Sequence, residues 1–115
     1  MRAPAMPLDR KVVLITGAAR RIGAALALAF HERGAAVAIH YRDSRNEAAR
    51  LVAAMNARRK GSAAGFQADL GDLDALVALP ASVIKTFGRL DVLINNAATF
   101  YPTPIGAITA VQFDD

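Results

Sequence analysis

Short apolar runs alternate along this chain with stretches of helical period, and this alternation constrains the fold more than any other feature. Four runs are apolar and short enough to be strands buried in a parallel sheet: residues 11–16, 35–40, 62–68 and 91–95. The segments between them carry apolar residues at helical spacing. The order β-α-β-α-β-α-β with short loops predicts an α/β fold with a doubly wound parallel sheet, right-handed crossovers and strand order 3-2-1-4.

Capping residues and prolines predict where the helices begin. S-R-N-E at residues 44–47 fits a capping box, in which the serine and the glutamate bond to free amides at a helix start. Pro80 lies inside the third helical period, where proline removes a hydrogen-bond donor and clashes with the preceding turn. We therefore expect a short turn near residues 72–78, followed by a separate helix that has Pro80 in its first turn.

The length of 115 residues allows a single domain. We assign residues 1–10 to an N-terminal extension and residues 11–115 to the α/β domain. A helix predicted to begin near Thr109 has no room to finish, so we expect the domain to be incomplete at its C-terminal end and to represent the N-terminal part of the fold.

Composition excludes several classes of protein. The absence of cysteine excludes disulfides, thiolate metal sites and cysteine nucleophiles. No apolar run approaches the roughly 20 residues of a membrane span. Residues 1–11 contain two prolines and no apolar core of a secretory signal. The sequence therefore predicts a soluble, cytoplasmic protein with no membrane partner.

The net charge of +4 raises the question of a nucleic-acid partner. The basic residues are scattered along the chain, and aromatic residues do not alternate with them, so we expect no nucleic-acid binding. A small phosphorylated ligand accounts better for local pairs such as Arg20 and Arg21.

The motif T-G-A-A-R-R-I-G at residues 16–23 lies between the first predicted strand and the first predicted helix. Glycines at this place permit a tight turn and a close backbone approach, and the free amides of a helix start attract a pyrophosphate. The spacing is near G-x-x-x-G-x-G, with Arg21 in place of the middle glycine. An ordinary strand–helix turn is the alternative. The strand, the helix start and two arginines together favour a Rossmann-type domain that binds a dinucleotide.

These residues resemble the cofactor turn of the short-chain dehydrogenases/reductases, and the middle arginine is similar to the pteridine reductase branch. The resemblance continues through H-Y-R-D-S at residues 40–44, N-A-R-R at 56–59 and Q-A-D-L at 67–70. It is strongest in G-R-L-D-V-L-I-N-N-A at residues 88–97, followed by F-Y-P-T-P at 100–104. The N-N-A segment indicates the superfamily, and F-Y-P-T-P is the narrower marker.

The end of the second predicted strand bears on the choice of cofactor. An acidic residue there would bind the ribose 2′-hydroxyl of NAD, whereas an arginine accepts the 2′-phosphate of NADP. Arg42 offers a planar set of donors, and Ser44 adds a hydroxyl at a helix start. The resemblance marks this segment as the NADP-selecting loop and implies NADP(H) as the cofactor. Asp43 departs from the branch, which carries a basic residue there. The alternative for Arg42 is a solvated surface arginine.

The resemblance places the remaining cofactor contacts at the ends of the third and fourth strands. Asp69 resembles the family's adenine-contacting aspartate, and a charge at a helix N-terminus is its alternative. Asn95 is explained equally well by a structural role, and Ala98 departs from a branch that often carries a hydroxyl there. The full set of expected cofactor-binding residues is Gly17, Arg20, Arg21, Ile22, Gly23, His40, Tyr41, Arg42, Ser44, Asp69, Leu70, Asn96, Ala97 and Ala98.

Two residues are expected to bind substrate. In the pteridine reductase interpretation, Phe100 stacks a pterin ring against the nicotinamide, and Arg21 bridges the pyrophosphate and the substrate. A packing role is the alternative for Phe100.

Catalytic and metal-binding groups are not expected within the chain. The family's acid/base chemistry resides in a tyrosine and a lysine four residues later. Tyr41 and Tyr101 are followed at that spacing by Arg45 and Ile105, so we expect the catalytic Tyr and Lys beyond Asp115.

The two histidines have no nucleophile or metal-ligand partner in the sequence, and we expect no metal site. His31 lies in the last turn of a predicted helix, where a contact with the helix dipole is its expected role.

These observations predict an NADPH-dependent short-chain oxidoreductase that reduces a C=N bond of a pterin or dihydrofolate, with a tyrosine outside this chain managing the proton. One alternative is a short-chain reductase acting on a carbonyl, such as a ketoacyl thioester or a sugar. Another is a non-catalytic dinucleotide-binding fragment. The resemblance implies a homo-oligomer, a tetramer in the family, and this segment by itself is expected to be inactive.

Overall fold

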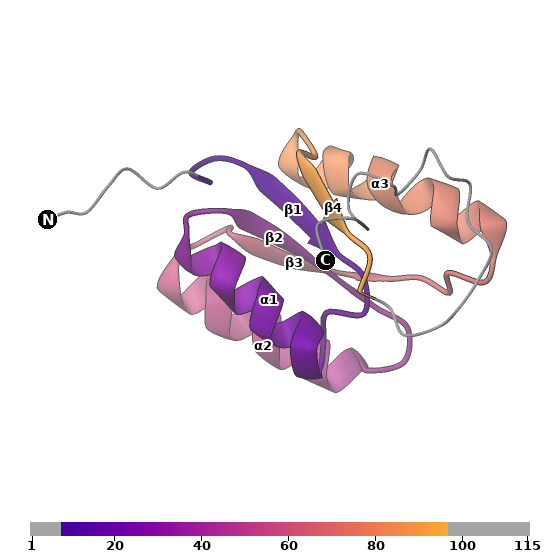
Figure 1. The fold of residues 1–115 in the computed structure, drawn as a ribbon, viewed down its shortest axis with the longest axis horizontal. Coiled ribbons are helices and arrows are strands. Elements are labelled where there is room, and N and C mark those ends of the chain that lie inside the picture. The colour runs from indigo at the N-terminus through magenta and orange to yellow at the C-terminus, as the bar shows by residue number, and fades with distance from the viewer. Residues whose placement is uncertain (1–7, 97–115) are drawn as a thin grey trace, which may run out of the picture.

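Strands and helices alternate in the structure, a computed structural model that describes residues 8–96. The elements in chain order are β1 (Val12–Ile15), α1 (Arg21–Glu32), β2 (Ala36–Tyr41), α2 (Arg45–Arg58), β3 (Ala63–Gln67), α3 (Leu73–Phe87) and β4 (Val92–Ile94) (Figure 1). The predicted alternation is confirmed, and the strand boundaries differ from the predicted ones by a residue or two.

The four strands form one parallel sheet in the order β3-β2-β1-β4, as the sequence predicted. Val13 of β1 lies between Val37 of β2 and Val92 of β4. Because β1 is central, its carboxyl end meets those of β2 and β4 at one edge of the sheet. Ligands of open α/β sheets bind at this edge, where the strand order reverses.

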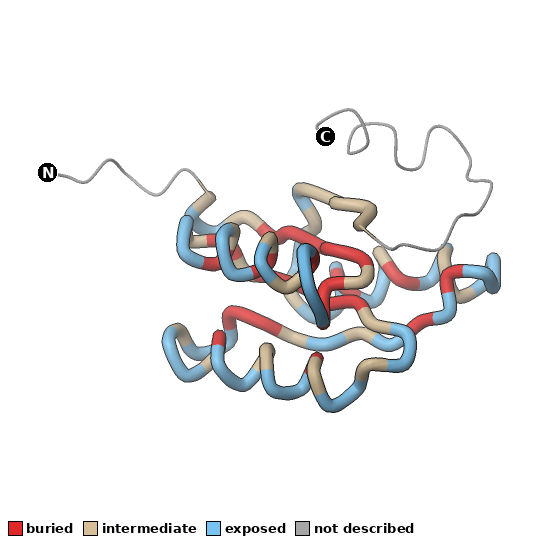
Figure 2. Tube along the Cα trace, turned by 60° about the horizontal axis from the view of Figure 1, so that its bottom comes forward, coloured by how far each residue is buried: buried red, intermediate tan, exposed pale blue. Residues whose placement is uncertain are grey.

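The two faces of the sheet carry different helices (Figure 1). Successive side chains of a strand point to opposite faces. Val13 packs in one core with Ala27 of α1 and Met55 of α2. Leu14, the next residue along, packs in the other core with Val83 of α3. The sheet is therefore covered on both sides, which explains why β1 is buried along its whole length (Figure 2).

The third helix differs from the prediction. It is one continuous helix from Leu73 to Phe87 with Pro80 inside it, not a short turn followed by a second helix. Asp72 caps its start, because the Asp72 side chain accepts hydrogen bonds from the amides of Asp74 and Ala75. Buried Leu79 and Val83 pack on the sheet on either side of the proline and stabilise the helical path through it.

The predicted capping box is also wrong in its hydrogen bonds. Ser44 is the N-cap residue of α2, as predicted, but its side chain makes no capping hydrogen bond. Its backbone has a φ of −85° and a ψ of 55°, outside the extended region in which a capping serine reaches the following amides. The serine hydroxyl therefore remains available to the cavity that Ser44 lines.

Within residues 8–96, no helix is long and apolar enough to cross a membrane.

Replacing Pro80 with alanine is expected to stabilise the protein. Proline cannot donate to the carbonyl of Leu76 four residues earlier, whereas alanine restores that bond within a helix already held by its cap and its packing. The gain in the free energy of unfolding is expected to reach up to about 3 kcal/mol. Urea denaturation of the full-length protein measures it. Ser82→Ala, at an exposed site of the same helix, is the control. A less stable Pro80→Ala variant would contradict this account.

Candidate functional site

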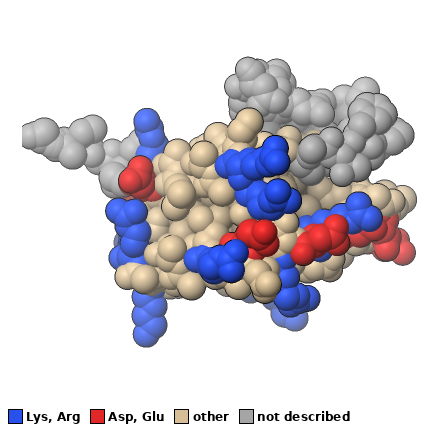
Figure 3. Space-filling model, turned by 90° about the horizontal axis from the view of Figure 1, so that it is seen from below, with Lys and Arg blue, Asp and Glu red and all other residues tan. Residues whose placement is uncertain are grey.

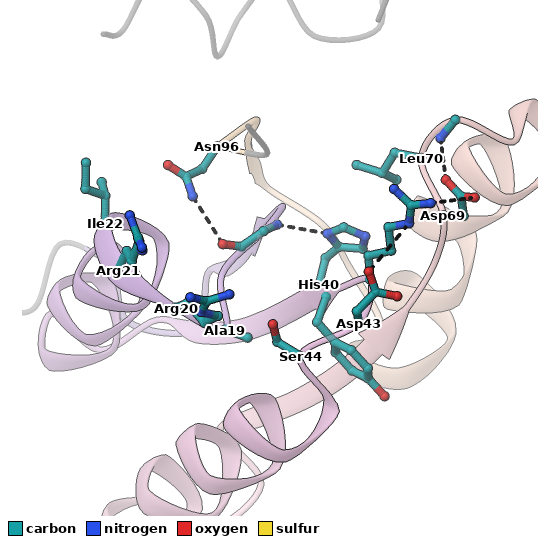
Figure 4. A pocket seen from close by; sticks show the side chains of 14 residues that line it. Ala19, Arg20, Arg21, Ile22, His40, Asp43, Ser44, Asp69, Leu70 and Asn96 are labelled. Carbon is teal, nitrogen blue, oxygen red and sulfur yellow. Dashed lines mark hydrogen bonds and ion pairs between the residues drawn. The ribbon is translucent and has the colours of Figure 1, made fainter. Parts of the chain in front are cut away.

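An open cavity of about 830 Å³ lies at the carboxyl edge of the sheet (Figure 4). It has the size of a small-molecule or cofactor site. Its walls come from the turn after β1, the end of β2, the loop after β3 and the end of β4. The lining residues are Gly17, Ala19, Arg20, Arg21, Ile22, His40, Tyr41, Arg42, Asp43, Ser44, Asp69, Leu70, Gly71 and Asn96.

The turn after β1 is anchored to the end of β2. Gly17 has a φ of 62°, the left-handed conformation that glycine adopts without steric cost. Its amide donates to Nδ1 of His40 at 2.9 Å, and the next amide, of Ala18, donates to the His40 carbonyl at 2.9 Å. The chain therefore turns sharply out of the sheet and places the start of α1 at the cavity.

Gly23 lies where α1 passes closest to the sheet. A Cβ at this position would overlap the carbonyl oxygen of Gly17 and the side-chain amide of Asn96. Both contacts are with groups held in place, since the Asn96 amide donates to the same Gly17 carbonyl at 3.2 Å. Only glycine fits, and α1 therefore directs its free amides at the cavity from close range.

A second set of hydrogen bonds ties β4 to the same turn. The Thr16 hydroxyl donates to Oδ1 of Asn95 at 3.0 Å and accepts from the amide of Asn96 at 2.8 Å. These contacts give Asn95 the structural role that the sequence left open. They also bring Asn96 to the wall of the cavity beside Gly17.

Two exposed arginines stand at the start of α1. Arg20 has an extended backbone with a φ of −142°, whereas Arg21 has a φ of 57°. Arg21 occupies the place of the middle glycine in the G-x-x-x-G-x-G spacing, and the structure gives it the conformation that a glycine would take there. For a non-glycine residue, this conformation costs roughly 1–2 kcal/mol. Such backbone strain is concentrated at functional sites.

A third arginine, Arg42, lies between two carboxylates on the other side of the cavity. One guanidinium nitrogen is 3.9 Å from Asp43 Oδ2, and another is 3.8 Å from Asp69 Oδ2. Both distances exceed those of hydrogen bonds, and exposed pairs of this kind contribute little to stability. The backbone of Arg42 is held more firmly than its side chain, because the Gln67 side chain donates to the Arg42 carbonyl at 3.1 Å. The guanidinium can therefore still donate to an anion in the cavity.

Charge on the surface away from these side chains is mixed. On the face turned toward the viewer in Figure 3, basic side chains lie interspersed with acidic ones. Among residues 8–96, no group of three or more His, Asp or Glu side chains could hold a metal ion. The arginines around the cavity are thus the feature that favours an anionic ligand.

The structure brings most of the predicted site residues together around this one cavity. Gly23 does not line the cavity but packs against two residues that do, Gly17 and Asn96. Ala97, Ala98 and Phe100 lie outside the described residues. Three lining residues, Ala19, Asp43 and Gly71, were not among the predicted contacts. Each adjoins a predicted residue in its motif, which is the sequence signal that could have identified it.

Comparison with known proteins establishes the family. The short chain dehydrogenase family matches residues 11–115. The chain is 41% identical over 111 residues to pteridine reductase 1 of Leishmania tarentolae, an alignment that covers 82% of this chain and 38% of the relative. This chain therefore belongs to the short-chain dehydrogenase family, whose members are oxidoreductases that bind nicotinamide dinucleotides and act on small molecules.

Other relatives act on different compounds. The chain is 41% identical over 107 residues to versicolorin reductase 1 of Aspergillus parasiticus, covering 93% of this chain and 40% of the relative. It is 37% identical over 110 residues to a hydroxynaphthalene reductase of Aspergillus fumigatus, covering 96% and 40%. The chain thus spans about two fifths of the length of these relatives.

Arg21→Gly is expected to raise the free energy of unfolding by about 1 kcal/mol, because glycine relieves the left-handed backbone. The same change is expected to weaken dinucleotide binding through loss of the guanidinium. Thermal denaturation and fluorescence titration of the full-length protein measure the two effects. Arg20→Gly is the matched control: its extended backbone gains no relief, so the added freedom of the unfolded chain should make it less stable. Equal destabilisation by both changes would show that Arg21 is not strained.

Proposed function

We propose that this chain is the cofactor-binding part of an NADPH-dependent short-chain reductase whose substrate is a pterin or a dihydrofolate. The single observation that carries the proposal is the set of arginines around the cavity, with Arg42 at the end of β2 in the position that discriminates the two nicotinamide cofactors. The identity with pteridine reductase 1, together with Arg21 in the middle of the turn, supports the substrate class.

The residues present suit a nicotinamide dinucleotide. Gly23 lets the start of α1 lie directly against Gly17 and Asn96, so the free amides at that start lie beside the cavity, where a pyrophosphate would bind. Arg20 and Arg21 stand beside those amides, and Asp69 and Leu70 would hold the adenosine side. When bound in reduced form, the nicotinamide supplies a hydride to the substrate.

The distances around Arg42 support NADP over NAD. Neither Asp43 nor Asp69 is within hydrogen-bonding distance of the guanidinium, so a 2′-phosphate could accept its hydrogens without first breaking a short pair. Asp43 opposes this preference, because its exposed carboxylate would repel the same phosphate. The protein is therefore expected to favour NADPH while keeping measurable affinity for NADH.

NADPH is expected to bind the full-length protein at least about tenfold more tightly than NADH, a difference of roughly 1.4 kcal/mol. Asp43→Asn should increase this ratio, and Arg42→Gln should abolish it. The exposed Arg50, which does not line the cavity, provides the matched control in Arg50→Gln. Fluorescence titration with both cofactors gives the four ratios. A preference for NADH, or a ratio that Asp43→Asn leaves unchanged, argues against the proposal.

Phe100→Ala is expected to weaken pterin or folate binding by about 1–3 kcal/mol, by analogy with the stacking of nucleic-acid bases on aromatic side chains. NADPH binding should change much less. Isothermal titration with each ligand separates the two effects. An equal loss for both ligands, or none for the pterin, would make Phe100 a packing residue and favour a carbonyl substrate.

A carbonyl reductase is the second candidate, and the equal identity to versicolorin reductase 1 favours it. Turnover of NADPH with dihydropterin, compared with turnover with a ketoacyl thioester, discriminates the two. In both cases we place the catalytic tyrosine and lysine beyond Asp115, in a cytoplasmic homo-oligomer. A full-length protein without a Tyr-x-x-x-Lys sequence would favour a non-catalytic dinucleotide-binding role.

A further inference from the structure

His40 is buried at the base of the cavity, and its ring contacts two of the cavity's walls. It belongs to β2, and only 2% of its surface is exposed. Nδ1 lies 2.9 Å from the amide nitrogen of Gly17, in the turn that faces the pyrophosphate side. Nε2 lies 2.8 Å from the carbonyl oxygen of Ala68, directly before Asp69 and Leu70 on the adenosine side. Figure 4 shows the ring between the turn and the loop after β3.

These two partners determine the protonation of the ring. An amide can only donate, so Nδ1 must be the unprotonated acceptor for Gly17. A carbonyl can only accept, so Nε2 must carry the hydrogen that binds Ala68. The ring is therefore neutral and in a single tautomer. Burial lowers the pKa of His40, and the Ala68 hydrogen bond opposes that shift only in part, which agrees with a neutral ring.

The backbone of β2 already makes one hydrogen bond to each of these two walls. The amide of Ala18 donates to the His40 carbonyl at 2.9 Å, and the amide of Ala68 donates to the Tyr41 carbonyl at 3.1 Å. Any residue at position 40 could make these contacts. The imidazole adds a second hydrogen bond on each side, to Gly17 and to Ala68. With both ring nitrogens engaged inside the protein, His40 has no hydrogen-bonding atom left for a ligand.

We propose that His40 is a positioning residue, which holds the pyrophosphate turn and the adenosine loop at a set separation and so prepares the cavity for its dinucleotide. The inference rests on the proposed function, since it needs a dinucleotide that spans both walls. It changes the role expected for His40 from the sequence, where it was grouped with the residues that touch the cofactor.

Two substitutions separate the two contacts. Asparagine places an amide oxygen near the position of Nδ1, so His40→Asn keeps the acceptor for Gly17 and loses the bond to Ala68. Glutamine places an amide nitrogen near the position of Nε2, so His40→Gln keeps the donor to Ala68 and loses the acceptor for Gly17. The probes are NADPH, which spans both walls, and 2′-AMP, which needs only the adenosine side.

In the full-length protein, His40→Gln is expected to weaken NADPH binding about tenfold and to leave 2′-AMP binding within about twofold of wild type. His40→Asn is expected to weaken both ligands by a similar factor of about three, because both contain the adenosine group. Hydrogen exchange reports the contact directly: the Gly17 amide should be protected in the wild type and in His40→Asn, and unprotected in His40→Gln.

His31 supplies the control for a purely structural effect. It too has 2% of its surface exposed, and its Nε2 lies 2.7 Å from the Ser62 hydroxyl, not in the cavity. Burial, with the nearby Arg59 and Arg58, lowers the pKa of His31, which favours the neutral form of this buried ring. His31→Gln should lower the melting temperature without changing the affinity for either ligand.

The outcomes are distinct. The inference is overturned if His40→Gln weakens NADPH and 2′-AMP by the same factor, as His40→Asn is expected to do. It is also overturned if neither His40 variant changes an affinity, or if His31→Gln changes the affinities as much as the His40 variants do. A wild-type protein that binds neither NADPH nor 2′-AMP refutes the proposed function, and this inference with it. Normal wild-type binding with an unprotected Gly17 amide refutes the inference alone.

Discussion

The close approach of α1 to the ends of β1 and β4 is the contact on which the rest of the site depends. It is possible because Gly23 has no side chain where the Gly17 carbonyl and the Asn96 amide lie. The same approach aims the first amides of α1 at the cavity and fixes β4 beside β1. A single side-chain carbon there would separate helix from sheet, and with them the turn after β1 from the rest of the cavity wall.

Polar groups around this contact divide into two kinds. The buried His40 ring is hydrogen-bonded on both sides, and the half-buried Asn96 side chain donates to the turn. Exposed ones are only loosely paired, as the distances from Arg42 to Asp43 and Asp69 show. This division follows from solvation, because an unpaired polar group is costly in the core and inexpensive in water. The buried groups therefore hold the shape of the cavity, and the exposed ones remain free to bind.

Local patterns in the sequence predicted much of the fold, and they failed where packing decided the outcome. The short apolar runs identified the strands, because a sheet covered on both faces requires continuous apolar segments, and the alternation with helices predicted their order. The pattern around Pro80 predicts a helix start, because the effect of proline on the backbone is local. The burial of Leu79 and Val83 against the sheet outweighed that effect. The predicted capping hydrogen bond of Ser44 is absent for a similar reason. The path of the chain out of β2 gives the serine a backbone conformation unsuited to capping.

The sequence by itself determined which residues gather at the site, because parallel strands all end at the same edge of the sheet and the motifs follow those ends. It also indicated the family, through the glycine spacing of the turn after β1 and through the N-N-A segment, and the family match confirms it. Only the tertiary structure decided what several of these residues do. His40 became a buried link between two walls, Arg21 adopted a glycine's conformation, and Asn95 joined β4 to β1. Each of these roles depends on which groups from distant parts of the chain lie within hydrogen-bonding distance, and local sequence does not encode that information.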